Sequence, residues 1–475
     1  MNIKSGLILI LLTVALAFCG CSKTDSTIAG ELTDEQIENI VRRSYQYVAM
    51  YNVINKNAMQ TGEQTGTSGW NTPVADTVLK DHTFRTIARP NNDTLYMSGM
   101  LDLRAEPMII EYPVFDSNYA VLETSAYDHY CDIPLSTTFG DFRKPTRILY
   151  YTARTSGYSG EPVKGIDTVM EMSGDFAIAF LRVMPHAAEP ERMQRNIATL
   201  QGIKVQGLSE YLGNPPTPTP AVVFPAVSTD AGVFKDNFLE VMQFVFNHTT
   251  FDPNDKLDRA VLEALKPLGV EPGKDFDSGA VEQIDGARFA MIAEKVAGEV
   301  ASLATSGQAG PLMLEMFKPK GEMTLDALVF QSVLGPIGVP AHQAVYPPVV
   351  AADGDPLNAL NDYVIRMSAD EMPPFEAFWS VTLYDLENGF FIPNDRKKYS
   401  VGENAGFKLD DNGGIEIHIA AEHPEGVPEE NWLPINRGDE NIDAVMRIYA
   451  PDLDRFATWT PPLAEKVSTG ESLKN

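Results

Sequence analysis

The pattern of apolar and polar positions begins, after residue 33, with one long amphipathic helix. Thr33 and Gln36 have the spacing of a capping box, and the helix is expected to run to about Asn57. Continued at helical spacing, its apolar stripe reaches Asn52 and Asn55, so the buried face becomes polar near its C-terminal end. Buried amides need hydrogen-bond partners, so these two are either links in the core or the wall of a polar pocket. The stripe itself consists of Ile37, Ile40, Val41, Tyr45 and Val48.

Beyond this helix, short apolar or alternating runs predict two strand-rich regions, each with turns rich in Pro, Gly or Asn. The first covers residues 83–151 and the second begins near residue 325. Residues 234–304 between them have helical periodicity and follow a proline-rich stretch at 215–220. This order predicts a mixed, mostly β fold in which two antiparallel β-sandwich domains are joined by a helical segment. The expected divisions are 34–215, 216–325 and 326–475, and no internal repeat is visible in the sequence.

The N-terminal residues predict export and a lipid anchor. Lys4 precedes an apolar run that is too short to span a bilayer, as in a secretory signal. The run ends in Phe18-Cys19-Gly20-Cys21-Ser22, which resembles a bacterial lipobox with Cys21 as the acylated residue. Residues 1–20 are therefore expected to be a lipoprotein signal peptide and 21–33 a tether; the alternative is an ordinary cleaved secretory signal. By the same resemblance, Ser22 favours the outer membrane of a bacterial cell envelope.

The charge balance restricts the partners. The chain has 37 Lys and Arg against 65 Asp and Glu, a formal net charge of −28. This excludes a general nucleic-acid binder and disfavours electrostatic attachment to an anionic membrane, so the membrane contact is expected through the lipid anchor alone. With Cys19 cleaved and Cys21 acylated, Cys131 would be the remaining cysteine, and it lies in a strand-like run where a buried, unreactive thiol is expected.

The densest group of polar residues follows Asp81. His82, Arg89, Asp93 and Tyr96 fall within fifteen residues of one another. As a site, this group would use His82 as a general base oriented by Asp93 or Asp81. The proposed ligand-binding side chains from this segment are Arg89, Asn91, Asn92 and Tyr96. The alternative is a structural network, because Asn91, Asn92 and Asp93 also have the chemistry of a turn.

Other parts of the chain supply weaker candidates. Arg447 and Tyr449 share one face of a strand, which is either a pocket wall or a solvated surface. Trp379 is a candidate ligand-stacking residue, although a sandwich core uses tryptophan in the same way. A metal site is geometrically allowed with Glu416 and His418 on one strand face and His423 just beyond it. Asn52 completes the set of predicted ligand-binding residues.

No familiar catalytic signature is present. The chain lacks a phosphate-binding loop, a Gly-x-Ser-x-Gly elbow, a His-Glu-x-x-His helix and a dinucleotide fingerprint. Any cofactor is therefore unknown, and function is expected in a pocket assembled from scattered residues.

Two long strings resemble a known bacterial family. Arg89-Pro-Asn-Asn-Asp-Thr-Leu-Tyr-Met-Ser-Gly-Met-Leu-Asp-Leu is similar to the signature of the domain of unknown function numbered 1254. Pro373-Pro-Phe-Glu-Ala-Phe-Trp-Ser-Val-Thr-Leu-Tyr-Asp, with Arg447-Ile-Tyr-Ala-Pro, is similar to its C-terminal companion, numbered 1214. The resemblance implies two sandwiches of jelly-roll character joined by helices. It implies an exported or cell-envelope protein and supplies no established reaction.

These observations lead to three functional hypotheses. The first is a lipid-anchored protein that binds or processes a small polar organic molecule, a saccharide or a carboxylate, in a cleft between the two sandwiches. The second is a non-catalytic envelope protein that binds another protein or a glycan. The third and weakest is a metal-dependent hydrolase. The sequence leaves the oligomeric state open.

Overall fold

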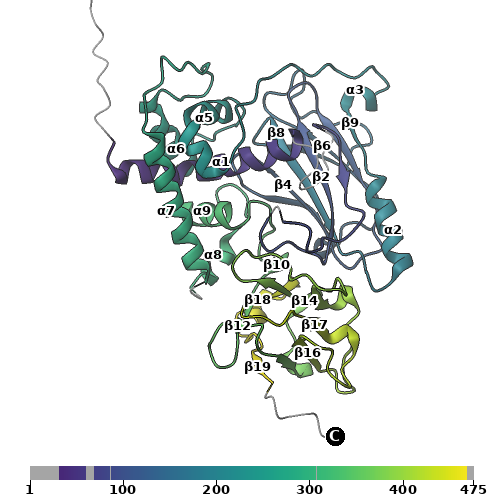
Figure 1. Ribbon diagram of the computed structural model, residues 1–475. Helices are drawn as coiled ribbons and strands as arrows, with labels where there is room; N and C mark the ends of the chain where they lie inside the picture. The colour runs from purple at the N-terminus through teal and green to yellow at the C-terminus, as the bar shows by residue number, and fades with distance from the viewer. Residues whose placement is uncertain (1–31, 60–68, 86, 306–307, 468–475) are drawn as a thin grey trace, which may run out of the picture.

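The computed structural model describes residues 32–59, 69–85, 87–305 and 308–467. The predicted signal peptide, Cys21 and nearly all of the tether lie outside these residues. Two sheet-rich domains and a helical layer make up the molecule, and the C-terminal domain lies below the other two parts in Figure 1. Within the described ranges, no helix is both long and apolar enough to cross a membrane. The mixed fold with two sheet-rich domains agrees with the sequence prediction.

The N-terminal domain consists of two packed sheets. Its five-stranded sheet has the order β1-β2-β8-β4-β5, and its four-stranded sheet has the order β7-β6-β3-β9. Alternate residues of both sheets meet in one apolar core. The strands are β1 Val74–Ala75, β2 Leu95–Asp102, β3 Met108–Tyr112, β4 Ala120–Ala126, β5 Asp132–Ser136, β6 Thr146–Tyr151, β7 Thr168–Glu171, β8 Phe176–Val183 and β9 Val205–Gly207. The helices of this domain are η1 Thr137–Phe139, α2 Pro190–Gln201 and α3 Leu208–Tyr211.

The C-terminal domain is a second sandwich. One sheet has the order β10-β18-β14-β15, with β11 and β12 also paired to β18, and the other has the order β17-β16-β13-β19. The strands are β10 Ala344–Val345, β11 Pro348–Val349, β12 Leu357–Asn358, β13 Tyr363–Met367, β14 Phe375–Asp385, β15 Ser400–Gly402, β16 Ile415–Ala420, β17 Trp432–Pro434, β18 Asn441–Pro451 and β19 Ala464–Lys466. Its helices are η3 Ala369–Glu371, η4 Glu403–Ala405, η5 Glu429–Asn431 and α10 Leu453–Phe456.

The two sandwiches share one topology. Taken in chain order, β2 to β9 correspond to β10 and β13 to β19, with the same neighbours in both sheets. Each copy includes one parallel pair, β6·β7 and β16·β17, beside otherwise antiparallel pairs. Two strands that are joined in sequence can be parallel only if the connection between them returns the chain to the end of the sheet where the first strand began. Residues 152–167 make this connection between β6 and β7, and residues 421–431 make it between β16 and β17.

Side chains at equivalent positions have diverged, which hides this repeat in the sequence. The central pair β3·β6 places Glu111 opposite Arg147, and these residues form an ion pair. At the same place in β13·β16, Arg366 stands opposite Glu416, also as an ion pair, so the two charges are exchanged. The sequence prediction of two β domains therefore holds, and the structure adds that the two domains repeat one strand order.

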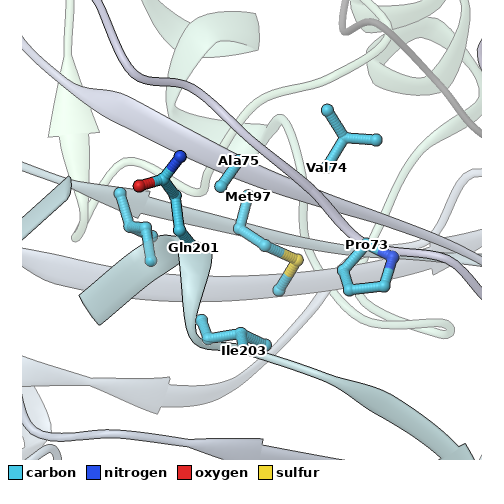
Figure 2. Close-up of a pocket in the computed structure, with 7 residues that line it drawn as sticks. Pro73, Val74, Ala75, Met97, Gln201 and Ile203 are labelled. Atoms are coloured by element: carbon cyan, nitrogen blue, oxygen red, sulfur yellow. The ribbon is translucent and has the colours of Figure 1, made fainter. Parts of the chain in front are cut away.

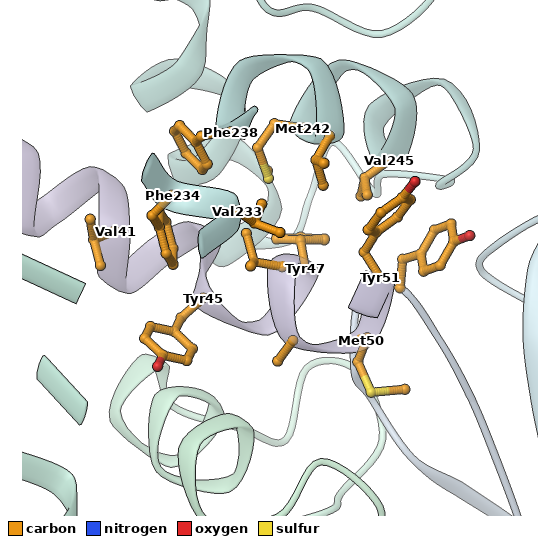
Figure 3. Close-up of a cluster of buried hydrophobic side chains, with 14 of the residues drawn as sticks. Val41, Tyr45, Tyr47, Met50, Tyr51, Val233, Phe234, Phe238, Met242 and Val245 are labelled. Carbon is orange, nitrogen blue, oxygen red and sulfur yellow. The ribbon is translucent and has the colours of Figure 1, made fainter. Parts of the chain in front are cut away.

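Helix α1 (Asp34–Met59) lies at the centre of the helical layer. Figure 3 shows its apolar side chains, among them Val41 and Tyr45, packed against Phe234 and Phe238 of the neighbouring helices. The capping box predicted at its start is present, with hydrogen bonds between Thr33 and the glutamine three residues on. The other helices of the layer are α4 Asp230–Asp236, α5 Phe238–Asn247, α6 Lys256–Leu265, η2 Lys266–Leu268, α7 Gly286–Thr305, α8 Gly310–Glu315 and α9 Leu325–Leu334.

The polar end of α1 makes hydrogen-bond links in the core. Asn52 donates from Nδ2 to Asp230 Oδ1 at 2.8 Å and accepts from the Ser228 backbone N–H. Asn55 donates to the Tyr127 hydroxyl at 2.9 Å. Both amides therefore hydrogen-bond α1 to the segments packed against it. Asn52 lies in the helical layer, away from the other predicted ligand-binding residues.

His129 joins the first sandwich to the end of α9. Its Nδ1 lies 2.8 Å from Ser332 Oγ, and its Nε2 lies 2.9 Å from the Pro336 carbonyl oxygen. Burial lowers its pKa to about 4, although Pro336 and Asp128 partly oppose this decrease. The neutral imidazole is therefore the form that the folded protein accommodates.

This depressed pKa predicts acid sensitivity. The stabilisation from His129 is complete above the ordinary histidine pKa of about 6.5 and is lost as the pH falls towards 4, a change of roughly 3 kcal/mol. His129→Asn tolerates the same left-handed backbone and has no titrating ring. Urea unfolding from pH 7 to pH 4 should show a steeper loss of stability in the wild type than in this variant; parallel curves would contradict the assignment.

Candidate functional site

One face of the β14·β18 pair turns towards the first sandwich. Because side chains alternate along a strand, Trp379 and Ile448 point into the core of the second sandwich, whereas Ser380, Arg447 and Tyr449 point away from it. Ser380 stands directly opposite Arg447 in the register of the two strands. These polar side chains therefore lie at the junction between the two domains, where an apolar cluster from both domains also packs.

Residues 89–93 of the N-terminal part of the chain lie across this face. Asp93 accepts hydrogen bonds at Oδ2 from Ser380 Oγ at 2.5 Å and from the Tyr449 hydroxyl at 3.0 Å. Asn91 donates to the same Tyr449 hydroxyl at 2.8 Å. Asp93 is 1% exposed, so a carboxylate from the first domain is buried against hydroxyls of the second.

The Arg447 guanidinium is held by neutral oxygens. Its Nη2 donates to the Tyr384 hydroxyl at 2.5 Å and to the carbonyl oxygen of Arg89 at 3.1 Å. Tyr384 in turn donates to the Pro90 carbonyl at 2.6 Å. The side chain is 4% exposed, and among the described residues no carboxylate oxygen lies within 4.0 Å of its nitrogens.

The first sandwich contributes a second buried arginine to the same junction. Arg182 on β8 stands opposite Tyr96 on β2, and its guanidinium lies over the Tyr96 ring at 5.6 Å. Its Nη2 contacts Glu123 Oε2 at 2.5 Å. Burial raises the pKa of Glu123 to about 7, although Arg182 opposes this increase.

The guanidinium groups of Arg182 and Arg447 both affect the pKa of the Tyr346 hydroxyl. Burial raises the pKa of the Tyr346 hydroxyl, and Arg182 and Arg447 each oppose that increase. Tyr346 and Tyr96 are half-buried, whereas both arginines are fully buried. The two arginines therefore face the same junction, and Tyr96 and Tyr346 are its partly exposed residues.

Several buried atoms of this site have no hydrogen-bond partner in the described part of the chain. Two of them are donor nitrogens of the buried arginines, two are acceptor oxygens of residues in the 89–93 segment, and one is a threonine hydroxyl. The atoms are Arg182 Nε, Arg447 Nη1, Asn92 Oδ1, Asp93 Oδ1 and Thr382 Oγ1. We call the side chains of Asn92, Asp93, Glu123, Arg182, Ser380, Thr382, Arg447 and Tyr449 the junction network.

The structure thus brings together most of the predicted ligand-binding residues of the 89–96 segment with Arg447. The side chain of Arg89 does not join this group. It is 44% exposed, and its Nε lies 2.6 Å from Asp443 Oδ2. Its backbone is in the left-handed region, with φ of 51°, and this turn directs its carbonyl oxygen to Arg447.

His82 does not join Asp93. Its Nδ1 lies 2.6 Å from the Tyr399 hydroxyl, and the Asp81 carboxylate accepts instead from Thr83. Within the described residues neither aspartate makes a hydrogen bond to His82. The acid–base arrangement expected from their closeness in sequence is therefore not formed.

Trp379 belongs to the core of the second sandwich. It is 1% exposed, and its ring centroid lies 5.2 Å from that of Phe407. The prediction that it stacks on a ligand is not supported, because β-strand alternation turns it away from the junction that its neighbour Ser380 faces.

The residues of the predicted metal site have protein partners. Glu416 pairs with Arg366 and lies 3.2 Å from His418 Nε2, while His423 packs on the Trp432 ring. Over the described ranges, no group of three or more His, Cys, Asp or Glu side chains is arranged to hold a metal ion. The metal-dependent hypothesis gains no support.

The sequence interpretation missed Glu123, Arg182 and Thr382, and it gave no role to Ser380. A usable signal existed for the first two, since each is a charged residue inside an otherwise apolar strand. Such residues are rarely buried without a specific partner.

Two cavities lie away from the junction. One pocket has a volume of about 260 Å³. Figure 2 shows Met97 of β2 in this pocket beside Val74 and Ala75 of β1, close to Gln201 at the end of α2 and to Ile203 just after it. None of the described residues that line this pocket is charged. The second cavity is about 90 Å³ and includes Lys320, which is ion-paired with Asp128 and Asp258.

Comparison with known proteins gives the family and fold. The family described as Protein of unknown function (DUF1254) matches residues 70–206, and Protein of unknown function (DUF1214) matches residues 343–453, together more than half of the chain. The VPA0106 protein from Vibrio parahaemolyticus has a similar structure, with a TM-score of 0.69 and 23% identity over 91% of this chain and 99% of that chain.

A putative uncharacterized protein from Burkholderia cenocepacia matches with a TM-score of 0.41 and 12% identity, over 91% of this chain and 93% of that one. No curated protein matches the chain. At 23% identity, the Vibrio parahaemolyticus structure supports the fold alone.

Proposed function

The chain belongs to the family that joins a DUF1254 domain to a DUF1214 domain, and from that premise we propose that it binds a small polar organic molecule, a saccharide or a carboxylate, at the junction of its two sandwiches. The observation that carries this proposal is that residues of both domains leave buried polar atoms without hydrogen-bond partners at the junction, where Asp93 of the first domain bonds Ser380 and Tyr449 of the second. Acyl attachment at Cys21 and a place in the bacterial envelope complete the proposal.

The energetic cost of these atoms supports a ligand. A buried polar group without a partner costs about 1–3 kcal/mol, and more when it is charged. Arg182 and Arg447 each leave one donor nitrogen unused, and Asn92 and Asp93 each leave one oxygen unused. A bound molecule with carboxylate or hydroxyl oxygens would supply the missing acceptors, and its hydroxyl protons would supply the missing donors.

Binding is the chemistry that the site supports best. His82 lies outside the network at Tyr399, so the general base expected from the sequence does not face the same residues as Asp93. The network instead offers fixed charges and hydroxyls held by both domains, which is suited to recognition and orientation of a polar ligand.

Calorimetry with a panel of saccharides and small carboxylates tests this function. Arg447→Met should weaken binding of any captured ligand by about tenfold or more, since removal of one partner of a buried charged hydrogen bond costs about 2 kcal/mol or more. Arg366→Met is the matched control, because this arginine lies on the outer sheet of the same domain in exposed ion pairs.

Arg366→Met should bind as the wild type does. Equal binding by Arg447→Met would contradict the assignment of the site. Capture of a protein or glycan with no small-molecule binding would favour the non-catalytic envelope protein instead.

A further inference from the structure

The shared topology makes the two buried arginines equivalent. Arg182 stands opposite Val121 in β4·β8, and Arg447 stands opposite Ser380 in β14·β18. The tyrosines correspond as well. Tyr96 stands opposite Arg182 in β2·β8. Tyr346 directly follows Val345, which stands opposite Ile448, so it lies at the end of β10 beside Arg447. Each sandwich therefore presents one arginine and one tyrosine to the junction from the same place in its sheet.

The equivalence fails at the residue that balances the arginine charge. In the first sandwich Glu123 stands opposite Phe180, two residues before Arg182, and its carboxylate contacts that guanidinium. In the second, the residue opposite Val445, two residues before Arg447, is Thr382. A threonine is thus present where the repeat has a glutamate.

The presence of threonine in place of glutamate would leave specific atoms of Arg447 and Thr382 without a hydrogen-bond partner. Arg447 Nη1 and Thr382 Oγ1 both lack a hydrogen-bond partner among the described residues. Asp93 does not fill the place, because its Oδ2 is taken by Ser380 and Tyr449, and it lies beyond 4.0 Å from the Arg447 nitrogens. A buried guanidinium without a contacting carboxylate is costly. The threonine side chain at 382 is shorter than a glutamate at this place would be.

We propose that a ligand carboxylate binds Arg447 in the place that the Glu123 carboxylate takes beside Arg182, with the Thr382 hydroxyl as a second donor. This inference rests on the proposed function and names its ligand class: a small carboxylate rather than a neutral saccharide. A carboxylate can accept from a guanidinium N–H and from a hydroxyl at once, and charge-assisted bonds of this kind are the strong ones. Hydroxyls on the ligand would meet the unused oxygens of Asn92 and Asp93.

Restoring the glutamate tests the inference. In Thr382→Glu, the new carboxylate is expected to pair with Arg447, so the ligand-free variant should melt at a higher temperature than the isosteric, uncharged Thr382→Gln. Acetate, glycolate and D-glucuronate, each compared with chloride at equal ionic strength, are the probes, and D-glucose is the neutral counterpart of D-glucuronate. At least one carboxylate should bind the wild type, with about tenfold weaker binding to Thr382→Glu. Thr382→Ser keeps the hydroxyl and should retain binding.

Two results would overturn the ligand class alone, and a third would overturn the site as well. One is a Thr382→Gln variant at least as stable as Thr382→Glu, which would mean that Arg447 does not favour a carboxylate at this place. The other is a wild type that binds D-glucose but none of the carboxylates; binding at the junction would then stand while its ligand class would be wrong. Carboxylate binding that survives in Arg447→Met would instead remove the proposed site itself.

Discussion

Trp379→Ala is expected to destabilise the protein by about 3–5 kcal/mol, because it removes a large buried side chain from a packed core. The indole is 1% exposed and lies among the apolar side chains of the second sandwich, beside Phe407. Urea unfolding followed by fluorescence measures this loss.

Trp379→Phe is the matched control, since it keeps an aromatic ring in the core. It should fold with a smaller loss of stability and should retain ligand binding, because the residue does not face the junction. A loss of binding in Trp379→Phe without loss of stability would restore the ligand-stacking role that the sequence suggested.

The second large effect is expected at the Arg182–Glu123 pair. Arg182→Met and Glu123→Leu should each cost about 3–5 kcal/mol, because each leaves one charged or polar partner buried alone. The double variant should be more stable than the sum of the two losses predicts, since no charge then remains to be paired. Two single variants within about 1 kcal/mol of the wild type would contradict burial of this pair.

The pH dependence of this effect has a definite sign. The pKa of Glu123 in the folded protein is raised by burial to about 7, above the ordinary value of 4.5. Relative to the unfolded chain, burial disfavours ionisation of Glu123, so the stability that the protonated form contributes is complete below about pH 4.5 and is lost as the pH rises through 7. Above that pH, the ionised carboxylate is the partner of Arg182. Glu123→Leu should remove this part of the pH dependence, which urea unfolding at pH 5 and pH 8 would detect.

Sequence pattern predicted many of the elements and which residues share a face, but β7, β8 and β9 lie outside the strand region predicted at 83–151. Alternation correctly placed Arg447 and Tyr449 together, since side chains on a strand repeat every second residue. It left open whether that face meets solvent or protein, because this depends on the strand and domain packed against it. The choice between Trp379 as core and as ligand contact was open for the same reason.

Closeness along the chain was a poor guide to closeness in space within the candidate site. His82 and Asp93 are near each other in sequence, yet the intervening turn at Arg89 and Pro90 sends them to different partners, Tyr399 and Ser380. Glu123 and Arg182 are far apart in sequence and meet only because β4 and β8 are neighbours. Strand order, which no local pattern contains, decides both outcomes.

The repeated topology explains why the junction is polar. Two similar sheets meet through equivalent faces, so each brings its arginine and tyrosine to the contact. The first sandwich places the Glu123 carboxylate in direct contact with its arginine, whereas the hydrogen-bond acceptors of Arg447 are neutral oxygens and the buried Asp93 carboxylate acts on it from farther away. A ligand carboxylate could bind Arg447 at the place in the second sandwich that corresponds to Glu123 in the first.

The most direct test of ligand binding at the junction is a crystal structure of the protein grown with D-glucuronate. The predicted result is electron density for the ligand between the two sandwiches, with its carboxylate on Arg447 Nη1 and Thr382 Oγ1 and a hydroxyl towards Asp93. Ligand density elsewhere on the molecule, with the Arg447 guanidinium paired to a side chain of the protein itself, would contradict the account.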